Sequence, residues 1–221
     1  MLDRFDDTCE RNLTEMLGME WERDIEAGTS ILHQRAFTEE KLLKAFGFRQ
    51  YSKPTKTPQA PGTRLSADDQ PATPDPVLHR RYRAILGALG WLNQGTRPDI
   101  SHAYSELSKF VQRPGQKHMD AAKYCLKYLA GTVDLCIHYG RTKDGKIEGR
   151  ELNRLWGWVP SGTQILPLIS TRVARTGYVI MMNGGPISWK SVKQKSVSLS
   201  TAESEWYAAS EAGKVLLYLR V

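Results

Sequence analysis

Several common features are scarce or missing in this chain, and each absence excludes a class of protein. The three cysteines, Cys9, Cys125 and Cys136, lie far apart and form no CxxC pair, so neither a disulfide framework nor a zinc site is expected. No apolar run approaches the roughly 20 residues that cross a bilayer. The opening MLDRFDDTCERN lacks the layout of a secretory signal. We therefore expect an intracellular protein, cytoplasmic or nuclear, that is not secreted and has no membrane partner.

Charge of both signs is present, with an excess of basic residues. The 221 residues include 31 Lys and Arg against 24 Asp and Glu, which gives a formal net charge of +7 and a pI near 9.3. This excess favours a polyanionic partner such as nucleic acid, although basic residues are also common on solvated surfaces. Hydrophobic residues make up 40% of the chain, enough for the cores of one or two domains.

Prolines divide the chain. Residues 52–76 hold a series of prolines and few large apolar residues, which predicts an extended connector without a helix or central strand. Before it, MEWERD and TSILHQ flank a turn-forming EAG and predict a hairpin. Thr38 is expected to cap a short helix that follows. The apolar face of that helix, formed by Leu42, Leu43 and Phe46, predicts that this unit is the tail of a larger domain.

Apolar residues then recur at helical spacing three times between the connector and Gly131. These patterns end at Gly95, Pro114 and Gly131 and predict a small helical bundle. Thr96 is expected to cap the second helix, which leaves Arg97 exposed at its start.

The last third of the chain changes to a strand-like pattern. LCIHY, GYVIMM and PISWKS predict strands, and Asn183-Gly184-Gly185 predicts a hairpin turn between the last two. Ser200 then begins a helix, with Glu203 at the third helical position of a capping box. Glu205 does not stand at a capping position, and Trp206 and Ala209 beside it are expected to face the core. For an isolated helical glutamate, a solvated surface charge is the usual interpretation.

Four short blocks, TRPDI, YLAGT, ISWKS-KQ and LSTAE-E, follow one another between Thr96 and Glu205. Their order and spacing resemble the Pol polyprotein of copia-type LTR retrotransposons. LGMEWERD and ILHQRAFTEEKLLKAFGF resemble the end of that family's reverse transcriptase. The resemblance covers nearly the whole chain.

The resemblance implies a mixed α+β and α/β fold in four parts. Residues 1–51 would be the end of the reverse transcriptase palm with the hairpin that supports the primer, and 52–76 a proline-rich linker. Residues 77–131 would be thumb and connection helices. Residues 132–221 would be a partial RNase H-like domain, a truncated β-sheet with a helix.

The resemblance also implies which catalytic residues to look for. The family's polymerase binds magnesium through a Tyr-x-Asp-Asp turn, and no such sequence occurs in this chain, so we expect no DNA synthesis. RNase H needs carboxylates that converge on two Mg²⁺ ions about 4 Å apart. The family's helix glutamate matches Glu205, which would be the sole residual catalytic carboxylate and metal ligand of an incomplete site. Mg²⁺ is the cofactor of the intact family, and we expect this chain to bind none.

The family's first RNase H aspartate has no counterpart, because no Asp or Glu occurs from Val159 to Val179. Hard cations need carboxylate or comparable oxygen ligands. A local frameshift over residues 160–174 is one explanation, and a diverged loop is the other. The nucleotide sequence distinguishes them, because a shifted reading frame would restore the acidic strand.

Three functions remain open at this point. The chain could be a degenerate reverse transcriptase/RNase H segment that is inactive unless other Pol segments complete it. It could be a non-catalytic binder of RNA–DNA hybrid or DNA, or a pseudogene product without a function. In the second case we expect phosphate contacts from basic side chains, namely Arg97, Lys117, Lys123, Lys127, Lys190, Lys193 and Lys195.

Overall fold

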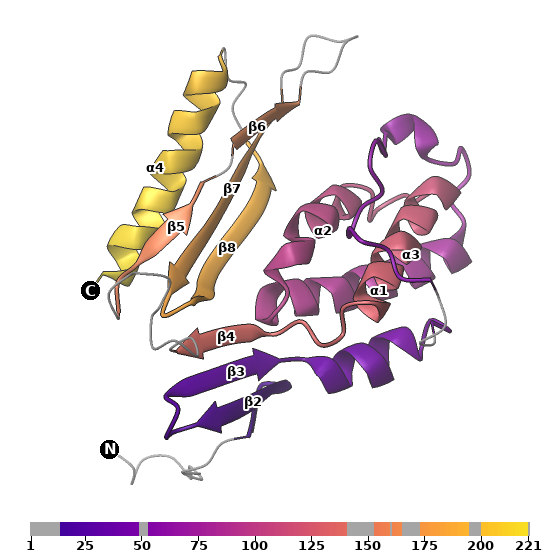
Figure 1. The fold of residues 1–221 in the computed structure, drawn as a ribbon. Helices are drawn as coiled ribbons and strands as arrows, with labels where there is room; N and C mark the ends of the chain where they lie inside the picture. Colours follow the sequence, from indigo (N-terminus) through magenta and orange to yellow (C-terminus); the bar gives the residue numbers. More distant parts are fainter. Residues whose placement is uncertain are drawn as a thin grey trace, which may run out of the picture.

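A computed structural model describes residues 14–48, 53–140, 153–159, 161–164, 173–194 and 200–220. Figure 1 shows three parts: a sheet near the N-terminus, a helical unit, and a second sheet that lies between the helical unit and the last helix. The predicted mixture of helices and sheets is confirmed. Within the described residues, no helix has the length and apolar character required to span a membrane.

The first sheet is antiparallel, in the order β1-β2-β3-β4. Its strands are β1 (Glu15–Met16), β2 (Met19–Asp24), β3 (Thr29–His33) and β4 (Ile137–Gly140). The predicted hairpin is confirmed, with Asp24 opposite Thr29. The strand predicted over LCIHY also forms, but it pairs with β3. The sheet therefore joins residues on both sides of the boundary expected at residue 132.

A short π-helix, η2 (Phe37–Leu43), follows β3. Leu42 and Leu43 are buried, as the pattern predicts. The expectation that Thr38 is the N-cap is wrong, because Ala36 is the cap residue and Thr38 lies inside the helix. The Thr38 hydroxyl donates to the Gln34 carbonyl 2.8 Å away, since Gln34 is four residues earlier in a continuous helical turn.

The helical unit confirms the three predicted helices. They are α1 (Pro76–Gly95), α2 (Ser101–Ser108) and α3 (Gln116–Ala130), with a 3₁₀ turn, η4 (Pro98–Ile100), before α2. Their apolar faces meet in one core, to which Leu42 of η2 also belongs. The expected N-cap role of Thr96 is wrong, because its hydroxyl donates to the Gln34 side-chain oxygen at 3.0 Å and Thr96 ends α1.

Over the described residues 53–75, the proline-rich connector has no α-helix or strand, as predicted, and it packs on the helical unit. Its 3₁₀ turn, η3 (Ala67–Asp69), is fixed by a capping box between Ser66 and Asp69. His118, buried at the start of α3, donates to the Ser66 carbonyl at 3.2 Å. A Cβ on Gly115 would lie 2.0 Å from the Asp69 carbonyl oxygen. Absence of a side chain at this position lets the connector approach α3 closely.

The second sheet is built around the long strand β7 (Val173–Met182). β8 (Gly185–Lys193) pairs along one edge of β7, while β5 (Trp156–Trp158) and β6 (Ser161–Gln164) occupy successive stretches of the other. Asn183 and Gly184 have φ values of 50° and 85°, the left-handed pair that a tight hairpin turn requires.

The last helix, α4 (Thr201–Leu219), packs across β6 and β7. Ser200 caps it and accepts a hydrogen bond from the Glu203 N–H at 3.1 Å, as the capping pattern predicts. The expected core positions of Trp206 and Ala209 are wrong, because both are exposed and Trp206 is 77% exposed. The face toward the sheet carries the small residues Ser204, Ala208 and Ala212 in its first half, which allow close approach of the helix to the strands. Val215, Leu216 and Leu219 pack against the core of the sheet further along the helix.

Candidate nucleic-acid interface and nuclease position

Glu205 is exposed on the first turns of α4, the helix that packs on β6 and β7. Between Asn153 and Arg220 the sequence holds only three carboxylates, Glu203, Glu205 and Glu211, and all lie on α4. None therefore comes from the strands. Among the described residues, no group of three or more His, Cys, Asp or Glu could hold a metal ion. The donor set present does not fit a two-magnesium centre, and Glu205 as a ligand stays a prediction.

The burial of Arg97 differs from what the sequence predicts. It is 3% exposed, so the prediction that it is exposed is wrong. Its guanidinium binds the Asp99 carboxylate, with Nη2 2.7 Å from Oδ2, and donates to the carbonyl and hydroxyl oxygens of Thr132 at 2.9 and 2.7 Å. Tyr128 donates to the same carboxylate at 2.9 Å. These contacts join η4 to the end of α3, and a phosphate contact by Arg97 stays a prediction.

The predicted lysines fall on separate surfaces. Lys123 and Lys127 are exposed one turn apart on α3, and Lys117 at the start of that helix is ion-paired with Asp69 at 2.9 Å. Lys190 and Lys193 are exposed on β8. Because strand side chains alternate, these two point to opposite faces of the sheet. Lys195 lies outside the described residues.

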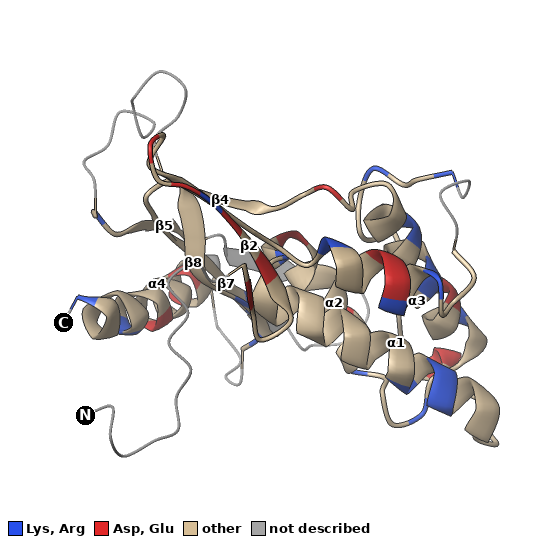
Figure 2. Cartoon of the chain, turned by 90° about the horizontal axis from the view of Figure 1, so that it is seen from below, with Lys and Arg blue, Asp and Glu red and all other residues tan. Residues whose placement is uncertain are grey.

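The sequence interpretation missed a group of arginines on α1. Arg80, Arg81 and Arg83 are exposed in its first turns, and a surface hollow of about 460 Å³ is lined by His79, Arg80 and Arg83 among others. Figure 2 shows basic residues on both α1 and α3, at the helical end of the molecule. The signal for these arginines in the sequence is the run HRRYR at residues 79–83, but helical periodicity by itself predicts only which side chains face the core.

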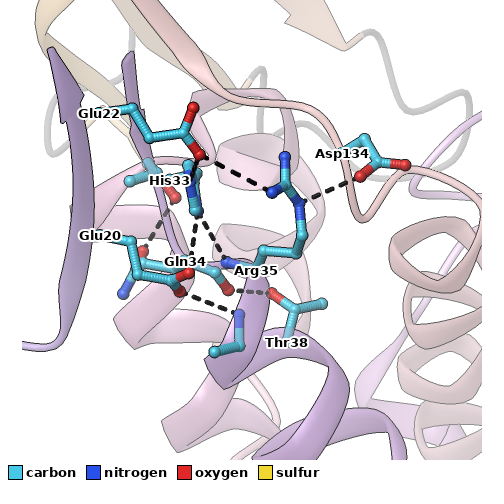
Figure 3. Close-up of polar contacts among 9 residues, drawn as sticks. Glu20, Glu22, His33, Gln34, Arg35, Thr38 and Asp134 are labelled. Atoms are coloured by element: carbon cyan, nitrogen blue, oxygen red, sulfur yellow. Dashed lines mark hydrogen bonds and ion pairs between the residues drawn. The ribbon is translucent and has the colours of Figure 1, made fainter. Parts of the chain in front are cut away.

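A polar cluster fastens the hairpin to the helical unit (Figure 3). Buried His33 lies between two glutamates, with Nε2 2.9 Å from Glu22 and Nδ1 3.4 Å from Glu20. Arg35 reaches Asp134, in the segment before β4, at 3.1 Å. The His33 hydrogen bond and charge, with that of Arg35 nearby, lower the pKa of Glu22. The cluster therefore has an ion-pairing role that links β2, β3 and the α3–β4 connection.

A crevice of about 330 Å³ separates α2 from the second sheet. Buried Arg175 of β7 crosses it to bind the Glu106 carboxylate and the Ser105 hydroxyl. Partial desolvation and the Arg175 charge lower the pKa of His102 at its edge. Burial alone would raise the pKa of Glu106, but Lys109 and Arg175 outweigh it and lower that pKa. Trp189 adds a bond from Nε1 to the Asn93 carbonyl at 2.7 Å.

Comparison with known proteins identifies relatives among transposon proteins. The chain is 33% identical over 209 residues to the retrovirus-related Pol polyprotein from transposon TNT 1-94 of Nicotiana tabacum, which is 93% of this chain and 15% of the relative. It is 33% identical over 168 residues to the Pol polyprotein from transposon RE1 of Arabidopsis thaliana, covering 76% of this chain and 10% of the relative. No family model and no solved structure matches.

One relative is matched over most of its length. The chain is 33% identical over 140 residues to secreted RxLR effector protein 161 of Plasmopara viticola, covering 63% of this chain and 92% of that protein. Since this relative is named as secreted, the intracellular location of our chain stays a prediction. The chain spans less than a sixth of the Pol relatives named above. The chain is a homologue of copia-type retrotransposon Pol polyproteins, and it belongs to the same family as RxLR effector protein 161.

Proposed function

We propose that the chain corresponds to the junction of reverse transcriptase and RNase H in a copia-type Pol polyprotein, and that it binds nucleic acid without catalysing either reaction by itself. The order of elements supports the assignment. The β2–β3 hairpin and three helices precede an antiparallel sheet with a helix packed across it, in the order that the resemblance implies.

The observation that carries the inactive assignment is the distribution of carboxylates. Strand β6 lies in the stretch from Val159 to Val179 that has no Asp or Glu, which is where the family's first RNase H aspartate would stand. Glu205 alone gives one carboxylate, whereas two magnesium ions need several converging oxygen ligands. Other Pol segments are the proposed source of any missing ligands.

The proposed nucleic-acid surface combines α1 and α3. Arg80, Arg81 and Arg83 on α1 and Lys123 and Lys127 on α3 are exposed. Exposed cations bind phosphates of any sequence by releasing counterions, so affinity should fall steeply with salt. The partner is therefore proposed as RNA–DNA hybrid or DNA, held through phosphates.

Binding of a labelled RNA–DNA hybrid, measured by fluorescence anisotropy over a salt series, tests this surface. The double variant Lys123→Ala/Lys127→Ala should reduce the slope of log K against log salt by about 1 to 2, because each phosphate contact contributes roughly 0.9. Lys214→Ala on α4 is the matched control, since Lys214 is exposed and paired with Glu211. An unchanged slope in the double variant contradicts the surface, and no binding by the wild type at low salt favours a product without function.

A further inference from the structure

Large apolar side chains of α4 are exposed in the described structure, and two of them, Trp206 and Leu217, lie on its outward face. Trp206, Leu217 and Tyr218 are 77%, 70% and 80% exposed. Figure 1 shows α4 on the side of the second sheet away from the helical unit, so this face points out of the molecule. Single exposed apolar residues are ordinary, but several along one helix mark an interaction surface.

Five exposed residues and the partly buried Gly213 follow a helix-pairing pattern. Glu203, Trp206, Ser210, Gly213, Leu217 and Arg220 are separated by alternating steps of three and four residues. This is the spacing of the seam along which two helices pack. It is distinct from the face toward the sheet, where Ser204, Ala208 and Ala212 are buried.

Two copies of this seam match each other when the helices run antiparallel. Its centre lies between Glu211 and Ala212, and an antiparallel copy places Trp206 opposite Leu217 of the second copy. Ser210 then faces Gly213, which is small and has open space where a Cβ would lie, so the helix centres can approach closely. At the ends, Glu203 faces Arg220 of the second copy, and both are exposed.

We propose that α4 pairs antiparallel with α4 of a second copy of this chain, which goes beyond nucleic-acid binding. The charged residues at the two ends of the seam favour the antiparallel direction of the helix pair. A parallel pair would place Glu203 beside Glu203 and Arg220 beside Arg220, whereas the antiparallel pair gives an attraction at each end. Antiparallel helices also bring opposite ends of their dipoles together. The interface is one helix wide, so its expected dissociation constant is about micromolar.

Sedimentation equilibrium on the nuclease-treated full chain tests the pairing. The wild type should change from monomer to dimer over about 1 to 100 μM. Trp206→Ser/Leu217→Ser should weaken the dimer at least about tenfold, because large apolar anchors dominate such interfaces. Ile25→Ser removes an apolar side chain that is 85% exposed at the hairpin turn and should leave the dimer unchanged. A monomer throughout, or a dimer that survives the double substitution, overturns the proposal.

A charge exchange tests the antiparallel direction. Glu203→Arg should weaken the dimer, and Glu203→Arg/Arg220→Glu should restore it, because Arg at position 203 would then face Glu at position 220. Both changes oppose the helix dipole, so a more stable isolated helix cannot explain recovery. Circular dichroism confirms folding of each variant. A double variant that is weaker than Glu203→Arg contradicts this arrangement.

Discussion

At the scale of the residue, the contacts of Arg97 with Thr132 change the role inferred for this basic side chain. The sequence places it two residues before Asp99, and that local pair is visible without a structure. Thr132, which accepts two of its hydrogen bonds, is 35 residues away. No periodicity predicts that contact, because it depends on how α3 ends against η4. The residue expected to bind phosphate is therefore part of the packing between helices.

Arg97→Ala should reduce the free energy of unfolding by about 3 kcal/mol, because the Asp99 carboxylate loses its charged partner and the Thr132 oxygens lose the guanidinium donors. Urea denaturation measures this loss. Lys123→Ala, at an exposed position on α3, should change stability by less than about 0.5 kcal/mol. The opposite pattern, an unchanged stability with weaker hybrid binding in Arg97→Ala, would restore Arg97 as a phosphate contact.

At the scale of the element, the periodic signals in the sequence predict the helices and hairpins, but they do not predict which elements contact one another. The three helices, the β2–β3 and β7–β8 hairpins and the Ser200 cap follow from local spacing and turn chemistry. Local spacing could not place β4 beside β3, since those strands are more than 100 residues apart. It also could not show that the connector packs on α3, because prolines exclude helices without saying where the backbone lies.

Two glycines test that packing of the connector. Gly115→Ala should destabilise the protein, because the new Cβ would lie 2.0 Å from the Asp69 carbonyl oxygen and the connector backbone would have to move. We expect a loss of about 1 to 3 kcal/mol in urea denaturation. Gly87→Ala is the control, since nothing lies within 4 Å of its Cβ on an exposed helix position. It should stabilise by up to about 1 kcal/mol. Equal effects at the two positions would contradict a tightly packed connector.

The crevice between α2 and β7 predicts a loss of stability in acid. The pKa of His102 lies below its usual 6.5, so the unfolded chain takes up a proton first and stability begins to fall below about pH 6.5. The pKa of Glu106 lies below 4.5, so its contribution is present above that pH and is lost as the pH falls through the folded value.

Thermal melting from pH 7 to pH 3 measures both groups. His102→Gln should reduce the first decline, to which His118 also contributes because burial lowers its pKa as well. Glu106→Gln should flatten the second decline while lowering stability at neutral pH, since Arg175 loses its charged partner. Glu211→Gln, in an exposed pair on α4, is the control and should retain both declines. A pH profile of Glu106→Gln that parallels the wild type would contradict a stabilising Glu106–Arg175 pair.

At the scale of the whole molecule, the resemblance predicted the order of the parts, and the structure adds how they meet. The first sheet, the helical unit and the second sheet are joined by buried polar contacts, with Arg175 and Trp189 crossing from the second sheet to the helices. The basic residues expected to act together are divided between α3 and β8. The arginines of α1 join the α3 lysines in the proposed surface, and only the three-dimensional arrangement suggests that grouping.

The central proposal is that the carboxylates in the described part of this chain do not form a two-metal nuclease centre. Its most direct test is cleavage of a labelled RNA–DNA hybrid by the purified chain in Mg²⁺ or Mn²⁺, with an intact RNase H as the positive control. We predict hybrid binding without cleavage, and no difference between the wild type and Glu205→Gln. Metal-dependent cleavage by the wild type that Glu205→Gln abolishes would contradict the account.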